Sequence, residues 1–196
     1  MPVPSVRRRP PRSDVREAVL AAAWDVFRRR GYERATLAEV ARTAGYTKGA
    51  VYSNFEGKDG LMLELLQRNV GARVGVLRER LEHLDVSADW RAEVARIAIE
   101  QLQEANEWTR LFLDFWSRAA ANPSLRKALA EVRQGVQADL ARTLEELPPT
   151  AVPPPVIART VFALANGLTI EAAIDDEPLD LEPYAVVIEG LLAEPA

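Results

Sequence analysis

The sequence of 196 residues contains no cysteine and only one histidine, His83. The absence of cysteine excludes disulfides, thiolate-bound zinc, iron–sulfur clusters and a cysteine nucleophile. With one histidine, a metal site built from several histidines or a Ser–His–Asp triad is hard to assemble. We therefore expect no metal, no other cofactor and no catalytic residues. The first twelve residues lead into no apolar segment of the kind that a signal peptide has, so we expect none.

Charge is distributed unevenly along the chain. Residues 1–58 hold 12 Lys and Arg against 6 Asp and Glu, whereas the remainder holds 13 against 23. A basic N-terminal third on an acidic body is typical of a nucleic-acid-binding head, although charge blocks are often only solvated faces. Residues 1–12 are rich in proline and arginine and lack apolar periodicity, so we interpret them as a disordered basic arm. Its arginines either enter a minor groove or form a solvated tail; they are Arg7, Arg8, Arg9 and Arg12.

Apolar residues recur at helical spacing through almost all of the remaining sequence, which predicts an all-α fold of about nine helices. In the first helix, Asp14 and Glu17 form an expected N-terminal capping pair, and Gly31 ends it. A capping box of Thr36 and Glu39 opens a short second helix. We expect the other helices at roughly 48–55, 59–84, 88–105, 107–120, 123–147, 156–174 and 180–193, with a proline-rich extended connector at 148–155.

Residues 36–55 have the layout of a helix-turn-helix, in which two short helices are joined by a tight turn at 45–47. Val51 and Phe55 of the second short helix are expected to face the core. That helix would then expose a compact polar face with Lys48 at its start, as a recognition helix does in a major groove. An ordinary helical corner fits the same pattern.

The segment LAEVARTAGYTKGAVYSNFEGKDGL at 37–61 resembles the N-terminal domain of the TetR family of bacterial transcriptional regulators. The helix before it fits the same domain, so the resemblance covers about residues 14–62. The sequence departs from the family at Asn54, where histidine is more frequent, and at Val51, where leucine is common. The resemblance implies a DNA-binding domain at 13–60, a helical regulatory and dimerisation domain at 61–196, and a cytoplasmic, nucleoid-associated bacterial protein.

The resemblance also implies which residues contact DNA. Thr47 and Lys48 would reach base edges or phosphates, and Gly49 and Ala50 would allow close approach to the groove. The remaining implied contacts are to phosphates, with Asn54 also able to reach a base: Thr36, Tyr52, Ser53, Asn54 and Lys58.

The expected helix at 156–174 is apolar on nearly all sides, with charges only at Arg159 and Glu171. Because such a helix must be buried all round, we expect one side to meet a second copy of the chain in a two-fold four-helix bundle. The predicted interface residues are Val156, Thr160, Ala163, Gly167, Leu181, Tyr184, Ile188 and Leu191. A two-fold dimer would read a palindromic operator with half-sites about one helical turn apart.

Aromatic residues are concentrated in the expected helix at 107–120, beyond what one buried stripe requires. They indicate either a pocket for an apolar or aromatic small molecule, oriented by a side-chain amide, or simply core. The candidate lining is Gln101, Trp108, Phe112, Phe115, Trp116, Phe162 and Asn166. Gly71 and Gly75 in the helix at 59–84 serve either close packing or a swing of the head relative to the body.

These observations predict a ligand-responsive DNA-binding regulator. We expect a repressor that binds a palindromic operator as a homodimer and is released by a small apolar or aromatic molecule. One alternative is a helical interaction protein whose head does not bind DNA. Another is an enzyme that uses the acidic helical body, although the sequence lacks a nucleophile–base pair, a second histidine and a phosphate loop.

Overall fold

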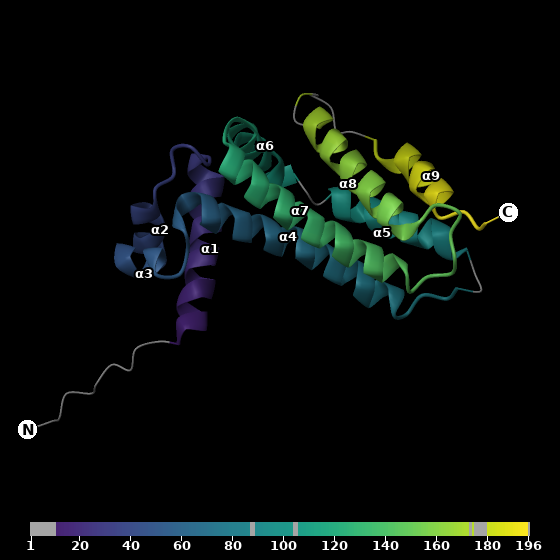
Figure 1. Ribbon diagram of the computed structural model, residues 1–196, viewed down its shortest axis with the longest axis horizontal. Coiled ribbons are helices and arrows are strands. Elements are labelled where there is room, and N and C mark those ends of the chain that lie inside the picture. The colour runs from purple at the N-terminus through teal and green to yellow at the C-terminus, as the bar shows by residue number, and fades with distance from the viewer. Residues whose placement is uncertain (1–10, 87–88, 104–105, 173, 175–179, 196) are drawn as a thin grey trace, which may run out of the picture. The chain divides into compact units, whose positions relative to one another are not determined.

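The computed structural model describes residues 11–86, 89–103, 106–172, 174 and 180–195 (Figure 1). Within these residues the chain forms nine α-helices and no strand, which confirms the all-α prediction. The helices are α1 (Arg12–Arg30), α2 (Leu37–Thr43), α3 (Lys48–Tyr52), α4 (Gly57–Leu81), α5 (Trp90–Gln103), α6 (Asn106–Ala121), α7 (Pro123–Leu144), α8 (Pro154–Glu171) and α9 (Glu182–Leu191). The chain divides into two compact units, residues 1–65 and 66–196, and α4 runs from the first into the second.

In the first unit α1, α2 and α3 pack on one another around an apolar core. Gly31 ends α1 with a φ of +74°, a conformation that side chains disfavour, and its N–H donates to the carbonyl of Phe27 over 2.8 Å. At the start of α2, Thr36 and Glu39 form the capping box that the sequence predicts. Local signals therefore set both ends of the loop that joins α1 to α2.

The start of α1 differs from the expectation. Asp14 and Glu17 do not cap the helix, because α1 already begins at Arg12, directly after Pro11. Arg12 therefore lies in a helix and not in the arm. Its side chain donates hydrogen bonds to Asn54 and to the Ser53 carbonyl, at the end of α3. A capping pattern cannot predict this contact, because the partners are 42 and 41 residues away. The remaining arm residues, 1–10, lie outside the described part of the chain.

In the second unit α7 packs against α6 and α8, and α5 packs against α9. Asn122 caps α7 and Pro123 occupies its first turn, as predicted. The buried hydroxyl of Thr143 donates to the carbonyl of Asp139 over 3.1 Å and accepts from Arg78 over 3.3 Å. These bonds satisfy a polar group inside the core and connect α7 to α4.

Several helix ends differ from the prediction. α8 begins at Pro154, inside the stretch expected as an extended connector. Proline fits there because the first N–H groups of a helix have no partner within it. α3, α4, α7 and α8 end three residues earlier than expected. Of the helices in the described ranges, none has the length and hydropathy needed to cross a membrane.

Candidate functional site

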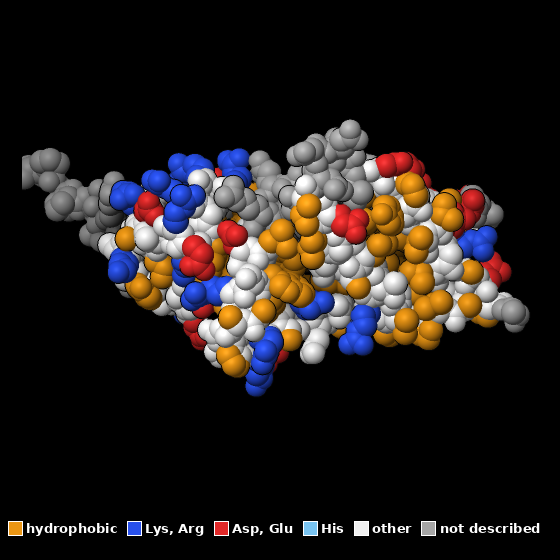
Figure 2. Space-filling model, turned by 90° about the horizontal axis from the view of Figure 1, so that it is seen from above, with side chains coloured by type: hydrophobic (Ala, Val, Ile, Leu, Met, Phe, Trp, Pro, Cys, Tyr) orange, Lys and Arg blue, Asp and Glu red, His pale blue; other side chains and the backbone are white. Residues whose placement is uncertain are grey.

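The polar face predicted for the second short helix is exposed. Thr47, Lys48, Gly49, Tyr52 and Ser53 are exposed, and Ala50 is half-buried. The Tyr52 ring is 54% exposed, and the ammonium of Lys48 lies 5.7 Å from its centre. On the opposite side Val51 and Phe55 are buried, as predicted. We call the face formed by Thr47, Lys48, Gly49 and Tyr52 the recognition surface; Figure 2 shows Lys and Arg side chains gathered over this N-terminal unit.

The fold leaves space for a side chain at Gly49. A Cβ built there would lie 3.8 Å from Oγ1 of Thr47, an ordinary van der Waals contact. Positive φ angles occur at Gly31, Gly45 and Gly57 among the described glycines, but not at Gly49. The fold therefore does not require glycine here, and its lack of a side chain leaves the backbone open to an outside molecule.

Thr36 is occupied by contacts within the chain. Its backbone N–H and its hydroxyl both donate to Oε2 of Glu39, over 3.2 and 3.1 Å, and its Oγ1 accepts from the N–H of Glu39. The hydrogen bond from the Thr36 side chain, with smaller contributions from Arg30 and Arg42, lowers the pKa of Glu39. An ionised carboxylate thus occupies the place at the N-terminus of α2 that a phosphate would take. The phosphate contact expected for Thr36 stays a prediction, and in the chain alone both of its donors bind Glu39.

Asn54 and Ser53 close the end of α3. The Asn54 side-chain amide and the Ser53 hydroxyl both donate to the carbonyl of Ala50, over 2.8 and 3.0 Å. Oδ1 of Asn54 accepts from Nε of Arg12 over 3.2 Å, and the Ser53 carbonyl accepts from the same guanidinium over 3.0 Å. These contacts engage both side chains at the helix end, and their expected contacts with DNA stay a prediction. They also bring the exposed Arg12 to this end of α3.

Lys58 contacts the chain itself, and its expected contact with a phosphate stays a prediction. Its ammonium donates to the carbonyl oxygens of Tyr32, Glu33 and Ala35, over 2.9, 3.1 and 3.2 Å. An ammonium has three N–H donors, so all of them are used. The ammonium also lies 4.4 Å from the centre of the buried Tyr32 ring, whose hydroxyl donates to Asp59. Lys58 therefore ties the first turn of α4 to the loop that follows α1.

Arg16 is a positioning residue that the sequence analysis missed. Its guanidinium lies 4.6 Å from the centre of the Phe55 ring and donates to the carbonyl of Asn54 over 2.6 Å. It also forms an ion pair with Glu64 of α4. Arg16 thus joins α1 to the segment after α3 and to α4. No spacing pattern reveals it, because its partners are far away in the sequence.

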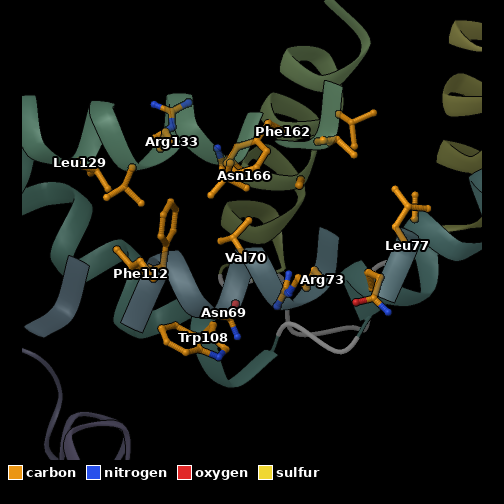
Figure 3. Close-up of a pocket in the computed structure, with 18 of the residues that line it drawn as sticks. Asn69, Val70, Arg73, Leu77, Trp108, Phe112, Leu129, Arg133, Phe162 and Asn166 are labelled. Carbon is orange, nitrogen blue, oxygen red and sulfur yellow. The ribbon is translucent and has the colours of Figure 1, made fainter. Parts of the chain in front are cut away.

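The second unit contains a pocket of about 190 Å³ between α4, α5, α6, α7 and α8. Five of the seven predicted residues line it: Gln101, Trp108, Phe112, Phe162 and Asn166. Figure 3 shows the Phe112 ring standing between the helices, with Phe162 and Asn166 reaching in from α8. The other two predicted residues do not line it. Phe115 is fully buried in the core, and Trp116 packs behind Phe112 with 5.2 Å between the ring centres.

The polar groups around this pocket come from several helices. Asn69 and Arg73 belong to α4, Gln101 to α5, Arg133 to α7 and Asn166 to α8. Among the described residues, no Asp or Glu lines the pocket. No sequence pattern indicates Asn69, Arg73 and Arg133, because only the packing of α4 and α7 decides which of their polar residues face inward.

Comparison with known proteins identifies the family. Residues 19–65 match the model of the bacterial regulatory proteins of the TetR family. Residues 88–194, more than half of the chain, match the model of the C-terminal domain of BetI-type transcriptional repressors. The chain belongs to the TetR family.

Individual TetR-family relatives agree with this assignment. The transcriptional regulator BetI of Rhizobium meliloti is 26% identical over 178 residues, which cover 89% of this chain and 85% of BetI. The transcriptional repressor BepR of Brucella suis is 44% identical over 59 residues, which cover 30% of this chain and 26% of BepR. The structure of the multidrug binding protein EbrR in complex with imidazole matches with a TM-score of 0.67 at 27% identity, over 96% of this chain and 98% of EbrR. The protein is a transcriptional regulator with an N-terminal helix-turn-helix, not a chance helical corner.

In this TetR-family regulator, α8 and α9 present apolar side chains to the surface. Val156 and Ile170 of α8 are 50% and 44% exposed, and Val186 and Val187 of α9 are 70% and 51% exposed. Figure 2 shows hydrophobic side chains spread over the face of the C-terminal unit. In the single chain one side of the helix expected at 156–174 is therefore exposed, and its burial by a second copy stays a prediction.

The predicted interface residues are placed differently on the two helices. Val156, Ala163 and Gly167 of α8 are exposed and Thr160 is half-buried, as are Tyr184 and Leu191 of α9. Leu181 and Ile188 are buried in the core of the second unit. Both belong to the same core cluster as Trp90, Val94 and Ala95 of α5, the helix that packs against α9. The exposed seam of α9 runs through Val186 and Val187 instead.

Proposed function

We propose that this TetR-family regulator is a repressor that binds a palindromic operator as a homodimer and leaves it when a small molecule fills the pocket of the second unit. The observation that carries the proposal is the recognition surface. A capped helix exposes a cation, a hydroxyl and a tyrosine, while its inner side is fixed by the buried Val51 and Phe55. Such a rigid, polar and accessible helix face is what reads a major groove.

We assign the DNA contacts to Thr47, Lys48, Gly49, Ala50 and Tyr52, with Arg12 beside them. The Thr47 oxygen accepts from the N–H of Ala50 over 3.2 Å, which leaves its hydroxyl proton for a phosphate. Lys48 donates to guanine acceptors or to phosphate. Arg12 is assigned a phosphate contact because its two described hydrogen bonds use two of its five N–H donors, whereas Thr36, Asn54 and Lys58 bind the chain itself.

We infer that the second copy covers the exposed apolar face of α8 and α9. Gly167 supports this assignment, because a Cβ there would meet nothing within 4 Å in the single chain, and its absence lets a partner helix approach closely. The interface is assigned to Val156, Ala163, Gly167, Ile170, Val186 and Val187, with Thr160, Tyr184 and Leu191 at its edge. A two-fold contact presents two recognition surfaces to the two halves of a palindrome.

The route from ligand to DNA is α4. Its first turn is anchored to the loop after α1 by Lys58, and its later turns line the pocket through Asn69, Val70 and Arg73. A ligand that shifts α4 therefore acts directly on the helix-turn-helix unit. A differential binding energy of about 1–3 kcal/mol is enough for a useful switch. The similarity to the repressor BepR and to the multidrug binding protein EbrR supports repression and a small-molecule effector.

The proposal is tested by selecting bound fragments from genomic DNA and measuring affinity by fluorescence anisotropy. We expect a palindrome bound by two chains, with an affinity that falls steeply as salt increases. Lys48→Ala should weaken specific binding by about 1–3 kcal/mol. Lys127→Ala is the matched control, because Lys127 is an exposed lysine on α7. A chain that binds no duplex at low salt, or a Lys48→Ala variant with full affinity, would contradict the proposal.

A further inference from the structure

We propose that the molecule bound in the pocket is an amphipathic anion, whose acidic group pairs with Arg133 and whose apolar body lies against Phe112 and Phe162. This inference rests on the proposed function in one respect: it takes the pocket to be the effector site. The class comprises carboxylates, sulfonates and phosphate monoesters that carry an aliphatic or aromatic body.

One donor of the Arg133 guanidinium lacks an acceptor among the described residues. Its Nε is buried and has no hydrogen-bond partner among the described residues. Buried donors in folded proteins are nearly always paired, and an unpaired one is costly. The guanidinium lies 4.7 Å from the centre of the Trp116 ring, which holds it in place without accepting a full hydrogen bond. A donor held rigidly at a pocket wall is poised for an acceptor from outside.

The electrostatic surroundings favour a negative charge. Burial, and to a smaller extent the charge of Arg159, lowers the pKa of Arg133. Arg73 lines the pocket from α4, and no described Asp or Glu lines it. A carboxylate brought in with the ligand would accept a charge-assisted hydrogen bond from Arg133 and offset the repulsion from Arg159. A cationic ligand would add a further positive charge to Arg73, Arg133 and Arg159.

The rest of the pocket lining favours a ligand with an apolar body. Trp108, Phe112 and Phe162 supply aromatic surface, and Leu129 and Val136 of α7 extend it with aliphatic surface. In Figure 3 Phe112 and Val70 face Leu129 and Phe162 across the pocket, with Arg133 on the α7 wall. The amides of Gln101 and Asn166 can orient a second polar atom, because an amide both donates and accepts. An apolar body with one acidic end fits this distribution.

The test compares probes that share one apolar body and differ in the charge of the head group. Octanoate, octanol and octylammonium are titrated into the full-length protein by calorimetry at pH 7, together with the 4-phenylbutyl acid, alcohol and amine. In at least one series we expect the acid to bind at least tenfold more tightly than the alcohol, and the amine more weakly than both. Equal binding of acid and alcohol, preference for the amine, or no binding in either series would overturn the inference.

Variants identify the residue. Arg133→Met keeps a long apolar side chain against Trp116 and should lower affinity for the acid at least tenfold without changing affinity for the alcohol. Arg126→Met, an exposed arginine on the same helix, is the control and should change neither. Acid binding that survives in Arg133→Met would contradict the assignment. If Arg133→Met does not fold, the comparison of probes with the unmodified protein still decides the charge of the ligand.

Operator release separates this inference from the proposed function. If the protein binds its operator, and a neutral or cationic compound in the pocket releases the protein from DNA, the proposed function is supported and the anionic ligand is contradicted. If acids bind through Arg133 but the protein binds no DNA, the anion site is supported and the proposed function is contradicted. Release of operator by the acid, and not by its alcohol, supports both.

Discussion

The ammonium of Lys58 lies 2.9 Å from the carbonyl oxygen of Tyr32 and 4.4 Å from the centre of the Tyr32 ring. This contact holds the first turn of α4 to the loop that follows α1. It gives the lysine a structural task in the helix-turn-helix unit. It also links the start of α4 to the segment that leads into α2.

Replacing Lys58 tests this structural task. Lys58→Met should lower the free energy of unfolding by about 1.5–3 kcal/mol, because three carbonyl oxygens lose a charged donor. Lys127→Met should change it by less than about 0.5 kcal/mol, since that lysine is exposed. Urea denaturation measures both. The salt dependence of operator binding should stay unchanged in Lys58→Met; a slope lower by about one phosphate contact would restore the expected DNA contact.

Gly49→Ala separates folding from DNA binding. The chain leaves room for the added methyl group, and alanine is the better helix former, so stability should stay equal or rise by up to about 1 kcal/mol. Affinity for the operator should fall at least tenfold, because the methyl group lies on the recognition surface. Gly135→Ala on α7 is the control, with nothing within 4 Å of its Cβ, and should leave DNA binding unchanged. An operator affinity of Gly49→Ala equal to that of the unmodified protein would show that this backbone does not approach DNA closely.

The proposed dimer predicts a difference between two equally exposed valines. Val187 on α9 is 51% exposed and Val86, after α4, is 54% exposed. Val187→Asp should convert the dimer to a monomer at micromolar concentration, because it places a charge in an apolar interface. Val86→Asp should remain dimeric. Sedimentation equilibrium measures the oligomeric state of both variants. If Val187→Asp also stays dimeric, α9 is not part of the interface.

The capping box predicts a pH dependence. The lowered pKa of Glu39 means that its contribution to stability is fully present above the ordinary value of about 4.5 and disappears as the pH falls through the folded-state value. The unmodified protein should therefore melt at a higher temperature than Glu39→Gln at pH 6. This difference should shrink towards pH 3. A difference that stays constant over this range would contradict the ionised capping box.

Gly71 and Gly75 of α4 are not required for close packing. A Cβ at either position would meet nothing within 4 Å in the described structure, so the packing alternative is not supported. Replacing both with alanine should stabilise the helix by about 1 kcal/mol per residue and keep operator affinity. If the flexibility of α4 transmits the ligand signal, the concentration of effector needed for release should rise. An unchanged release curve would exclude a role for these glycines in the response.

Local signals in the sequence determined the all-α architecture and the core of the first unit. The capping box at Thr36, the cap at Asn122 and the inward face of Val51 and Phe55 could all be predicted, because each depends on residues within one or two turns of a helix.

Only the tertiary structure decided which polar side chains bind the chain and which face outward. Lys58 meets the loop after α1, and Arg133 borders the pocket, through contacts between segments distant in sequence. The side of α9 that remains exposed is likewise set by α5, which covers Ile188 and leaves Val187 at the surface. Periodicity shows that a helix has an apolar side, but the apolar residues of α9 extend around most of its surface, and the choice among them depends on which helix packs there first.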